Sequence, residues 1–274
     1  MSRLPPFALA VLTALGVTLM AWPGEAAQIP VRFAEGVTHG FLALRSLRGD
    51  ALAQGSLLQV ARGDRVESRL VFRFKDGSVY DETVVFSQQK VFTMLSYRLA
   101  QRGPAFPENL EASLDRASGR YTVTSRAGNK GREQVFSGTM ELPADVYNGM
   151  ILTVVKNLAK DASETVHVVA FTPKPRLMEL ELLPVGEQQV LVGDVAKTVT
   201  HYTLKPRLGT VLKLLASLFG KLPPDYHCWV LTEDVPAFVR FEGPLSLKAP
   251  VWRIELISPR WPRWEPAPVV PASR

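Results

Sequence analysis

Cysteine is nearly absent from this chain: Cys228 is the single cysteine in 274 residues. One cysteine excludes an internal disulfide and a metal site built from several thiolates. Cys228 lies in the apolar run HCWVL at 227–231, so we expect it to be a small buried hydrophobic residue and not a nucleophile. Stability must therefore come from the hydrophobic core.

Long runs of one charge are also missing. The chain has 32 Lys and Arg against 26 Asp and Glu, a formal net charge of +6, and its basic residues are scattered through the sequence. Scattered charge favours general solubility and an affinity for anionic envelope surfaces, and it gives little support to nucleic-acid binding. No nucleic-acid partner is predicted.

Motifs of enzymes and cofactor sites are absent as well. The sequence has no GxSxG turn and no glycine-rich phosphate loop. Its histidines form no HxH, HxxxH or HExxH pair, which favours structural or surface roles over a metal site. They are His39, His167, His201 and His227. The sequence thus predicts no catalytic residue, no metal site and no cofactor.

One acidic group suggests a two-carboxylate site. Asp76, Asp81 and Glu82 are close in sequence, but adjacent residues on a strand point to opposite faces, and a turn explains Asp76. An envelope enzyme with a site assembled from distant strands, for instance His201 with Asp81 or Glu82, is an alternative. It requires these side chains to come within hydrogen-bond reach.

The N-terminus has the pattern of a secretory signal. Arg3 precedes an apolar run at 7–20, and small residues follow, ending at Ala26 and Ala27. The run is too short for a comfortable membrane span, so we favour a cleaved signal at 1–27 over an uncleaved anchor. The mature chain is expected in the periplasm or outside the cell, with no transmembrane anchor.

Strand patterns fill most of the remaining sequence. Residues 64–75 alternate apolar and polar side chains, Asp76-Gly77 is a strong hairpin-turn signal, and 79–86 forms the return strand. Similar runs recur to residue 257, giving about a dozen strands. Alternation is commoner than continuous apolar runs, which predicts antiparallel pairing.

Two stretches have helical spacing instead. Pro143 and Asp145 supply a start signal for a long amphipathic helix at about 143–160, and a second, shorter candidate covers about 208–219. The predicted fold class is mainly β, with a large curved antiparallel sheet or half-barrel wrapped around the first helix.

The domain organisation follows from these segments. After the signal we expect a single β-rich domain at 28–258, in two halves at about 28–140 and 141–258. Residues 259–274 are rich in proline and lack a packing period, which is typical of a disordered tail.

Aromatic side chains gather in strands of both halves. An ordinary filled β core explains this pattern; an open, concave apolar face would instead accept an acyl chain or another hydrophobic ligand. The residues predicted to line such a face are Phe72, Phe74, Tyr80, Phe86, Met150, Val154, Trp229 and Phe241.

The leading hypothesis is a secreted, periplasmic, non-enzymatic protein. Its predicted partners are a lipid-like or other hydrophobic or amphiphilic ligand, or an envelope protein, held on the concave face of the sheet. Besides the enzyme alternative, the chain could act as a structural or assembly module through an exposed strand edge.

Several segments resemble an uncharacterised family of bacterial periplasmic β-rich proteins, a domain of unknown function. They are 142–160, 192–195 (VGDV), 201–204 (HYTL) and 229–243 (WVLTEDVPAFVRFEG), with 72–83 (FRFKDGSVYDET) and 103–107 (GPAFP) similar to secreted proteins of environmental bacteria. The resemblance implies a periplasmic β-rich domain and brings no catalytic residues. At fold level the pattern is also similar to lipoprotein-carrier half-barrels.

Overall fold

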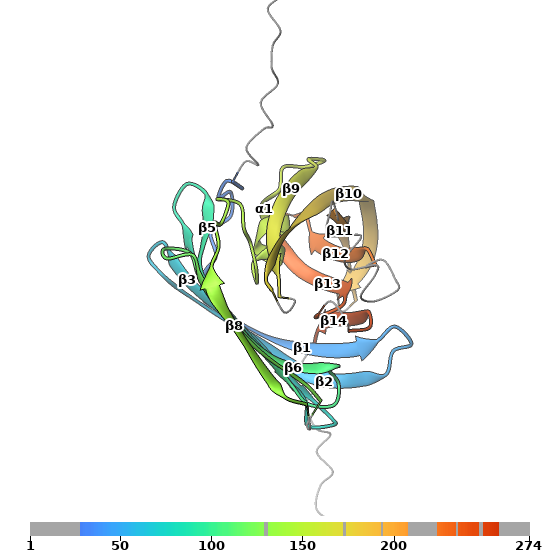
Figure 1. Ribbon diagram of the computed structural model, residues 1–274. Coiled ribbons are helices and arrows are strands. Elements are labelled where there is room, and N and C mark those ends of the chain that lie inside the picture. The colour runs from blue at the N-terminus through green and yellow to red at the C-terminus, as the bar shows by residue number, and fades with distance from the viewer. Residues whose placement is uncertain are drawn as a thin grey trace, which may run out of the picture.

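The computed structural model describes residues 28–128, 131–171, 174–192, 194–207, 224–233, 235–246 and 249–257 (Figure 1). Within these ranges, fourteen strands form one antiparallel sheet, and one short helix, α1 (Ile151–Asn157), contacts β12 and β13. In chain order the strands are β1 (Thr38–Ser46), β2 (Ala51–Arg62), β3 (Arg65–Phe74), β4 (Val79–Gln88), β5 (Phe92–Arg102), β6 (Glu108–Asp115), β7 (Arg120–Ala127), β8 (Glu133–Thr139), β9 (Glu164–Ala170), β10 (Arg176–Val192), β11 (Val195–Arg207), β12 (Tyr226–Leu231), β13 (Ala237–Gly243) and β14 (Trp252–Leu256).

The strands follow one another across the sheet in two meanders. The order runs from β8 to β1, passes to β14, and then runs from β14 to β9. We call β1–β8 the first meander and β9–β14 the second; they join where Leu44 of β1 lies opposite Ile254 of β14. The sheet curls so that the second meander lies inside the curve of the first (Figure 1). The mainly β, antiparallel prediction is confirmed.

The β3–β4 hairpin forms as its sequence predicts. Along β3, Val66, Phe72 and Phe74 are buried while Glu67 is exposed, because successive side chains point to opposite faces. Gly77 has a φ of +86° in the turn, a conformation that glycine adopts without steric cost. Local sequence therefore suffices to set this hairpin and its register.

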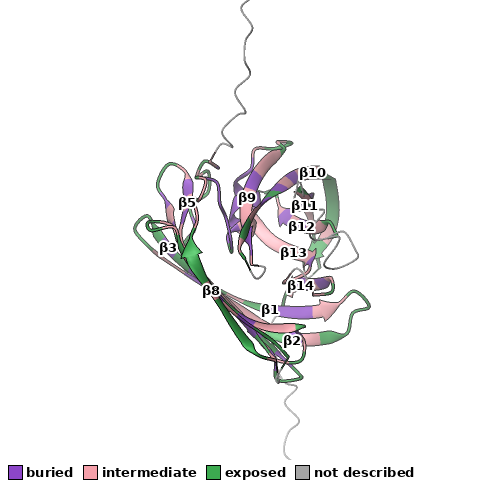
Figure 2. Ribbon diagram, in the orientation of Figure 1, coloured by how far each residue is buried: buried purple, intermediate pink, exposed green. Residues whose placement is uncertain are grey.

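The core is one cluster to which both meanders and α1 contribute. Among its largest fully buried side chains are Phe72 and Phe86 of the first meander, Leu204 of the second, and Tyr147 and Met150 between the meanders. Buried residues occur along strands of both meanders, among residues of intermediate and high exposure (Figure 2). Burial of this apolar surface is the main stabilising term.

The two edges of the sheet differ. β8 is exposed along its length apart from the half-buried Phe136, as the green ribbon in Figure 2 shows. The β9 edge is instead covered by residues 145–148, which we call the cover segment: the Tyr147 N–H donates to the His167 carbonyl at 2.9 Å, and the His167 N–H donates to the Asp145 carbonyl at 3.0 Å. Within the described residues the sheet does not close.

The predicted helix at 143–160 is mostly wrong. The structure has only the seven residues of α1, beginning after Met150, and the cover segment pairs with β9 instead. Asp145 does not cap a helix; its Oδ2 lies 2.7 Å from His167 Nδ1. Gly149, at a φ of +70°, turns the chain between the cover segment and α1, so a continuous helix cannot form.

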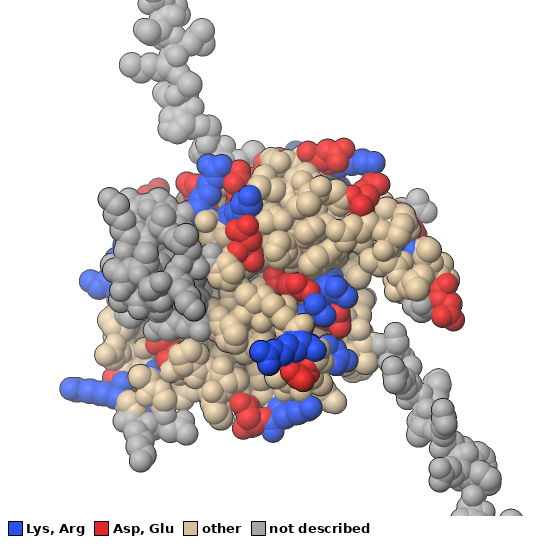
Figure 3. Space-filling view, turned by 90° about the vertical axis from the view of Figure 1, so that its right-hand side faces the viewer, with Lys and Arg blue, Asp and Glu red and all other residues tan. Residues whose placement is uncertain are grey.

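Three further predictions lie outside the described residues: the signal at 1–27, the helix candidate at 208–219 and the tail at 259–274. In the part of the chain that is described, no helix is both long and apolar enough to span a bilayer. Charges of both signs are interspersed on the side of the molecule drawn in Figure 3.

Candidate functional site

A cavity of about 210 Å³ lies between the two meanders. Its walls are mainly apolar and come from the inward faces of β4–β6, from β9–β13 and from the start of α1, including Leu99, Leu110, Met178 and Leu204. We call it the inner cavity. Its polar lining consists of Tyr80, Glu82, Tyr97, Asn148, Tyr226 and Ser246.

Strand alternation places one carboxyl group in this apolar wall. Glu82 lies between Tyr80 and Val84 on the inward face of β4, while its neighbour Asp81 points outward. Outside, Asp81 forms a bidentate pair with Arg69, at 2.9 Å from Nε and 2.6 Å from an Nη atom. The expectation that Asp81 and Glu82 point to opposite faces is thus confirmed.

The Glu82 carboxyl group is held by tyrosine hydroxyls. Tyr97 on β5 donates to Glu82 Oε1 at 2.7 Å. Burial raises the pKa of Glu82 above its ordinary value, although hydrogen bonds from Tyr97 and Tyr80 favour the ionised form. Burial likewise raises the pKa of both tyrosines well above 10. Burial therefore makes this carboxyl group easier to protonate than an exposed one, and in its protonated form it can donate as well as accept a hydrogen bond.

Phe171 joins the meanders at the side of the cavity. Its ring stacks on Tyr97 with centroids 5.5 Å apart and an angle of 3° between the planes. Because Phe171 follows β9 and Tyr97 lies on β5, this contact bridges the opposed walls. Pro244 and Leu245, which follow β13, also line the cavity, so connecting segments contribute to its rim.

A second side-chain cluster lies on the outward face of β11–β13. His201 stacks on Trp229 with centroids 4.5 Å apart, and its Nε2 is 3.0 Å from His227 Nδ1. Burial and the neighbouring His227 lower the pKa of His201. His201 faces outward and Glu82 faces the inner cavity, so the structure does not bring His201 together with Glu82. Asp81 pairs with Arg69 instead.

The predicted ligand-binding residues do not share one cavity. Tyr80 and Phe241 line the inner cavity. Phe72, Phe86, Met150 and Val154 are instead buried in the core, each only 0–1% exposed. Phe74 packs on Phe106 and Trp252, and Trp229 lies on the outward face with His201. Phe72, Phe74 and Trp229 do not line the inner cavity, and their part in ligand binding stays a prediction.

Sequence reasoning named Glu82 as a possible catalytic residue but not as part of a ligand-binding wall, and it missed Asn148. Glu82 carried a signal, since it interrupts the apolar face formed by Tyr80, Val84 and Phe86. Asn148 carried none, because its partner Val169 is 21 residues away in sequence. In the described ranges, no three His, Cys, Asp or Glu side chains are grouped so that they could hold a metal ion.

Comparison with known proteins gives little. No family model and no curated protein matches the chain. Among solved structures it is similar to a beta-barrel-like protein of domain of unknown function DUF1849 from Brucella abortus, with 11% identity and a TM-score of 0.43 over 82% of this chain and 98% of that one. So distant a similarity assigns no function. The resemblances to a periplasmic family and to lipoprotein-carrier half-barrels stay predictions.

Proposed function

We propose that this chain is a non-enzymatic periplasmic protein that binds a small amphiphilic ligand in the inner cavity. The observation that carries the proposal is the Glu82 carboxyl group in a mainly apolar wall, hydrogen-bonded to Tyr97 at 2.7 Å. A polar group in such surroundings lowers stability unless its hydrogen bonds are satisfied. A ligand with a polar end would supply a further partner.

The chemistry of the site indicates which polar end fits. A neutral carboxyl group offers one donor and an acceptor oxygen, so it suits a hydroxyl or a carbonyl group. An anionic head group beside Glu82 would bind only if that carboxyl group stayed protonated, because two negative charges in one cavity repel each other. The proposal therefore favours a neutral head on an apolar tail.

The size of the cavity limits the tail. Sites for drug-sized ligands are usually about 300–1,000 Å³, and this cavity is about 210 Å³. It accommodates a short apolar segment, with the rest of a longer ligand projecting past Leu245. An occupied cavity would bury the tail against Leu110 and Phe241.

Native mass spectrometry on protein recovered from the periplasm of a bacterial host tests this proposal. We expect a retained ligand mass that solvent extraction removes, and re-binding of decanol in preference to decanoate. Leu110→Trp should abolish both by filling the cavity, whereas Leu191→Trp, at a position 73% exposed, should not.

Glu82→Gln keeps the proposal testable if Leu110→Trp fails to fold. We expect it to leave decanol binding in place and to remove the preference over decanoate, because it cannot ionise. An apo mass in every sample and no binding of either probe would overturn the proposal. Equal binding of both probes to the wild type would overturn the role of Glu82. Recovery of the uncleaved chain from the cytoplasm would overturn the periplasmic location.

The exposed β8 edge supports a second candidate, an assembly module. Val135 is 61% exposed, and no described segment pairs with the outer side of β8. An unprotected edge can add a strand from a partner. Light scattering after size-exclusion chromatography should then show an assembly that Val135→Lys dissociates; a monomer at all concentrations would contradict self-assembly.

A further inference from the structure

The outward face of the first meander carries a row of hydrogen-bonding side chains that crosses the strands. From β3 to β8, each strand contributes one residue that lies directly opposite the next residue of the row. These residues are Arg69, Thr83, Arg98, Ser113, Thr122 and Ser137. The row contains no carboxylate and no aromatic ring. With strands about 4.8 Å apart it extends about 24 Å.

The surface is hollowed along this row. Two hollows of about 540 and 420 Å³ share Thr83, Arg98, Ser113, Thr122 and Glu67. A third of about 220 Å³ lies at the β2–β3 end and shares Glu67 and Arg69 with the first of them. We call the three together the outer groove. The row lies on the opposite face of the sheet from the inner cavity, and Tyr97 and Leu99 border both. The inference drawn from it does not rest on the function proposed for the inner cavity.

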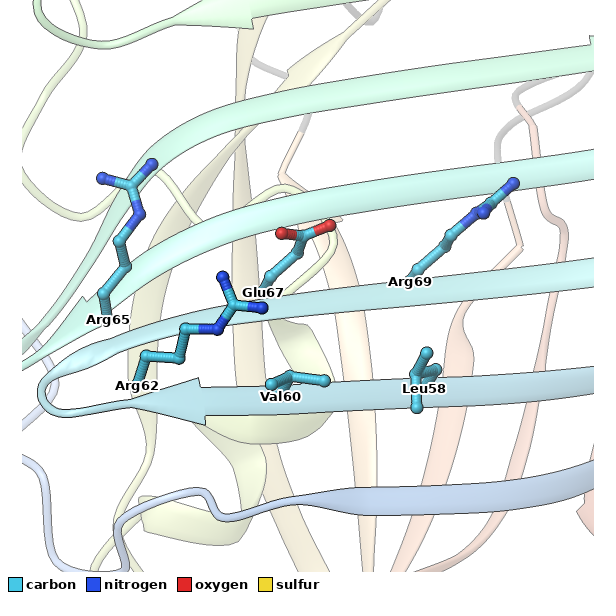
Figure 4. Close-up of a pocket in the computed structure, with 6 residues that line it drawn as sticks. All are labelled: Leu58, Val60, Arg62, Arg65, Glu67 and Arg69. Carbon is cyan, nitrogen blue, oxygen red and sulfur yellow. The ribbon is translucent and has the colours of Figure 1, made fainter.

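The β2–β3 end carries a surplus of positive charge, since three arginines, Arg62, Arg65 and Arg69, line its hollow together with one carboxylate, Glu67. Arg62 lies directly opposite Arg65 across the hairpin, and like charges in this position are destabilising. Figure 4 shows both side chains extending from the same side of the sheet as Glu67 and Arg69. Among the described residues, neither Arg62 nor Arg65 has an ion-pair partner within 4.0 Å, whereas Arg69 pairs with Asp81 at 2.6 Å. A bound anion would relieve this repulsion.

We propose that the outer groove binds an acidic polysaccharide. The guanidinium groups of Arg62, Arg65 and Arg98 match carboxylate, sulfate or phosphate substituents in bidentate geometry. The Ser and Thr hydroxyls between them both donate and accept, which suits the hydroxyl groups of a sugar chain. The length of the row suits an extended chain of several units.

Other polyanions fit this surface less well. An extended peptide would pair with a free strand edge or place side chains in apolar pockets, and the middle of the row offers neither. Single-stranded nucleic acid would need a series of exposed aromatic stacking platforms, whereas the aromatic residues that border the groove are the buried Tyr97 and the half-buried Tyr121. A membrane surface would need an exposed apolar face beside its basic groups, whereas the row consists of Arg, Ser and Thr side chains.

Fluorescence polarisation with labelled oligogalacturonate tests the proposal on the full mature chain. We expect salt-sensitive binding that weakens at least about tenfold in the double variant Arg62→Gln and Arg65→Gln and in the single variant Arg98→Gln, since each removes a charge-assisted contact. Arg98→Lys should restore only part of the affinity, because lysine lacks the planar fork.

A matched control removes two cations elsewhere. Lys160→Gln with Arg207→Gln removes the exposed ion-pair partners of Glu187 and Glu181. Because both positions are distant from the groove, the double variant should change the affinity for oligogalacturonate by less than about twofold. Circular dichroism confirms that each variant is folded. No binding of oligogalacturonate, an equal loss in the control, or equal binding of neutral maltodextrin would each overturn the proposal. Tighter binding of polyglutamate would favour an acidic peptide and overturn it too.

Discussion

Removal of the Asn148 side-chain amide should destabilise the chain by uncovering the β9 edge. Its Oδ1 accepts from the Val169 N–H at 2.7 Å, and its Nδ2 donates to the Val169 carbonyl at 2.9 Å. One side chain thus replaces the neighbouring strand that Val169 would otherwise need. Both residues are buried, at 8% and 3% exposure.

The magnitude follows from these two bonds. A buried backbone group left without a partner costs about 1–3 kcal/mol. Asn148→Ala leaves two such groups of Val169 without a partner, which would lower the free energy of unfolding by about 2–6 kcal/mol. Asn148 also lines the inner cavity, and water entering there would satisfy part of this demand. We therefore expect a loss of about 2–4 kcal/mol.

Urea unfolding followed by tryptophan fluorescence measures this loss as a lower midpoint with an unchanged m-value. Asn148→Asp should be no better than Asn148→Ala, because its carboxylate would face the Val169 carbonyl oxygen. Gln189→Ala is the control: it removes an exposed hydrogen bond to Thr198 and should cost less than about 0.5 kcal/mol. If Asn148→Ala costs no more than this control in ligand-free protein, the cover segment does not protect the β9 edge.

Three further predictions concern the inner cavity and its surroundings. Burial raises the pKa of Glu82 above 4.5, so the folded state holds this proton more tightly than the unfolded state does, and stability falls as the pH rises through the folded pKa. Glu82→Gln should therefore be more stable than the wild type near pH 7 but not near pH 3. A difference in urea midpoints that does not change with pH would contradict this. Phe171→Leu should lower stability by about 0.5–1.5 kcal/mol beyond its lost area, through loss of the Tyr97 stack, and should weaken decanol binding; unchanged values would show that the stack does not join the meanders. Burial raises the pKa of the Cys228 thiol to about 12, so Ellman's reagent should label it only after unfolding in guanidinium, and prompt labelling of native protein would refute its burial.

The sequence predicted best those features that depend on neighbouring residues. The β3–β4 hairpin follows from side-chain alternation and from Gly77, and both act within one turn. The burial of Cys228, at 0% exposure, follows from its apolar neighbours. The helix prediction failed because apolar spacing between Val146 and Leu158 serves two elements, a bridge to β9 and a short helix, and Gly149 separates them.

The inner cavity could not be predicted because it depends on the curvature of the whole sheet. Tyr97 and Phe171 are far apart in sequence and come into contact only when the second meander curls inside the first. The same packing fills the space around Phe72 and Val154, which sequence reasoning placed in the binding face. Composition indicates which side chains turn inward, but not where the opposed walls leave a gap.

The two-residue period of β4 and β5 makes the two proposed sites separable by mutation. The Glu82 carboxyl group and the Tyr97 hydroxyl that binds it face the inner cavity, while the neighbours Thr83 and Arg98 face the outer groove, which the Tyr97 residue also borders. Adjacent residues thus face different proposed ligands, although one backbone holds them. If both proposals are right, Tyr97→Phe should alter decanol binding without affecting oligogalacturonate, and Arg98→Gln should do the reverse. Loss of both activities in either variant would mean that the strands act as one coupled unit, because independent sites on opposite faces have additive effects.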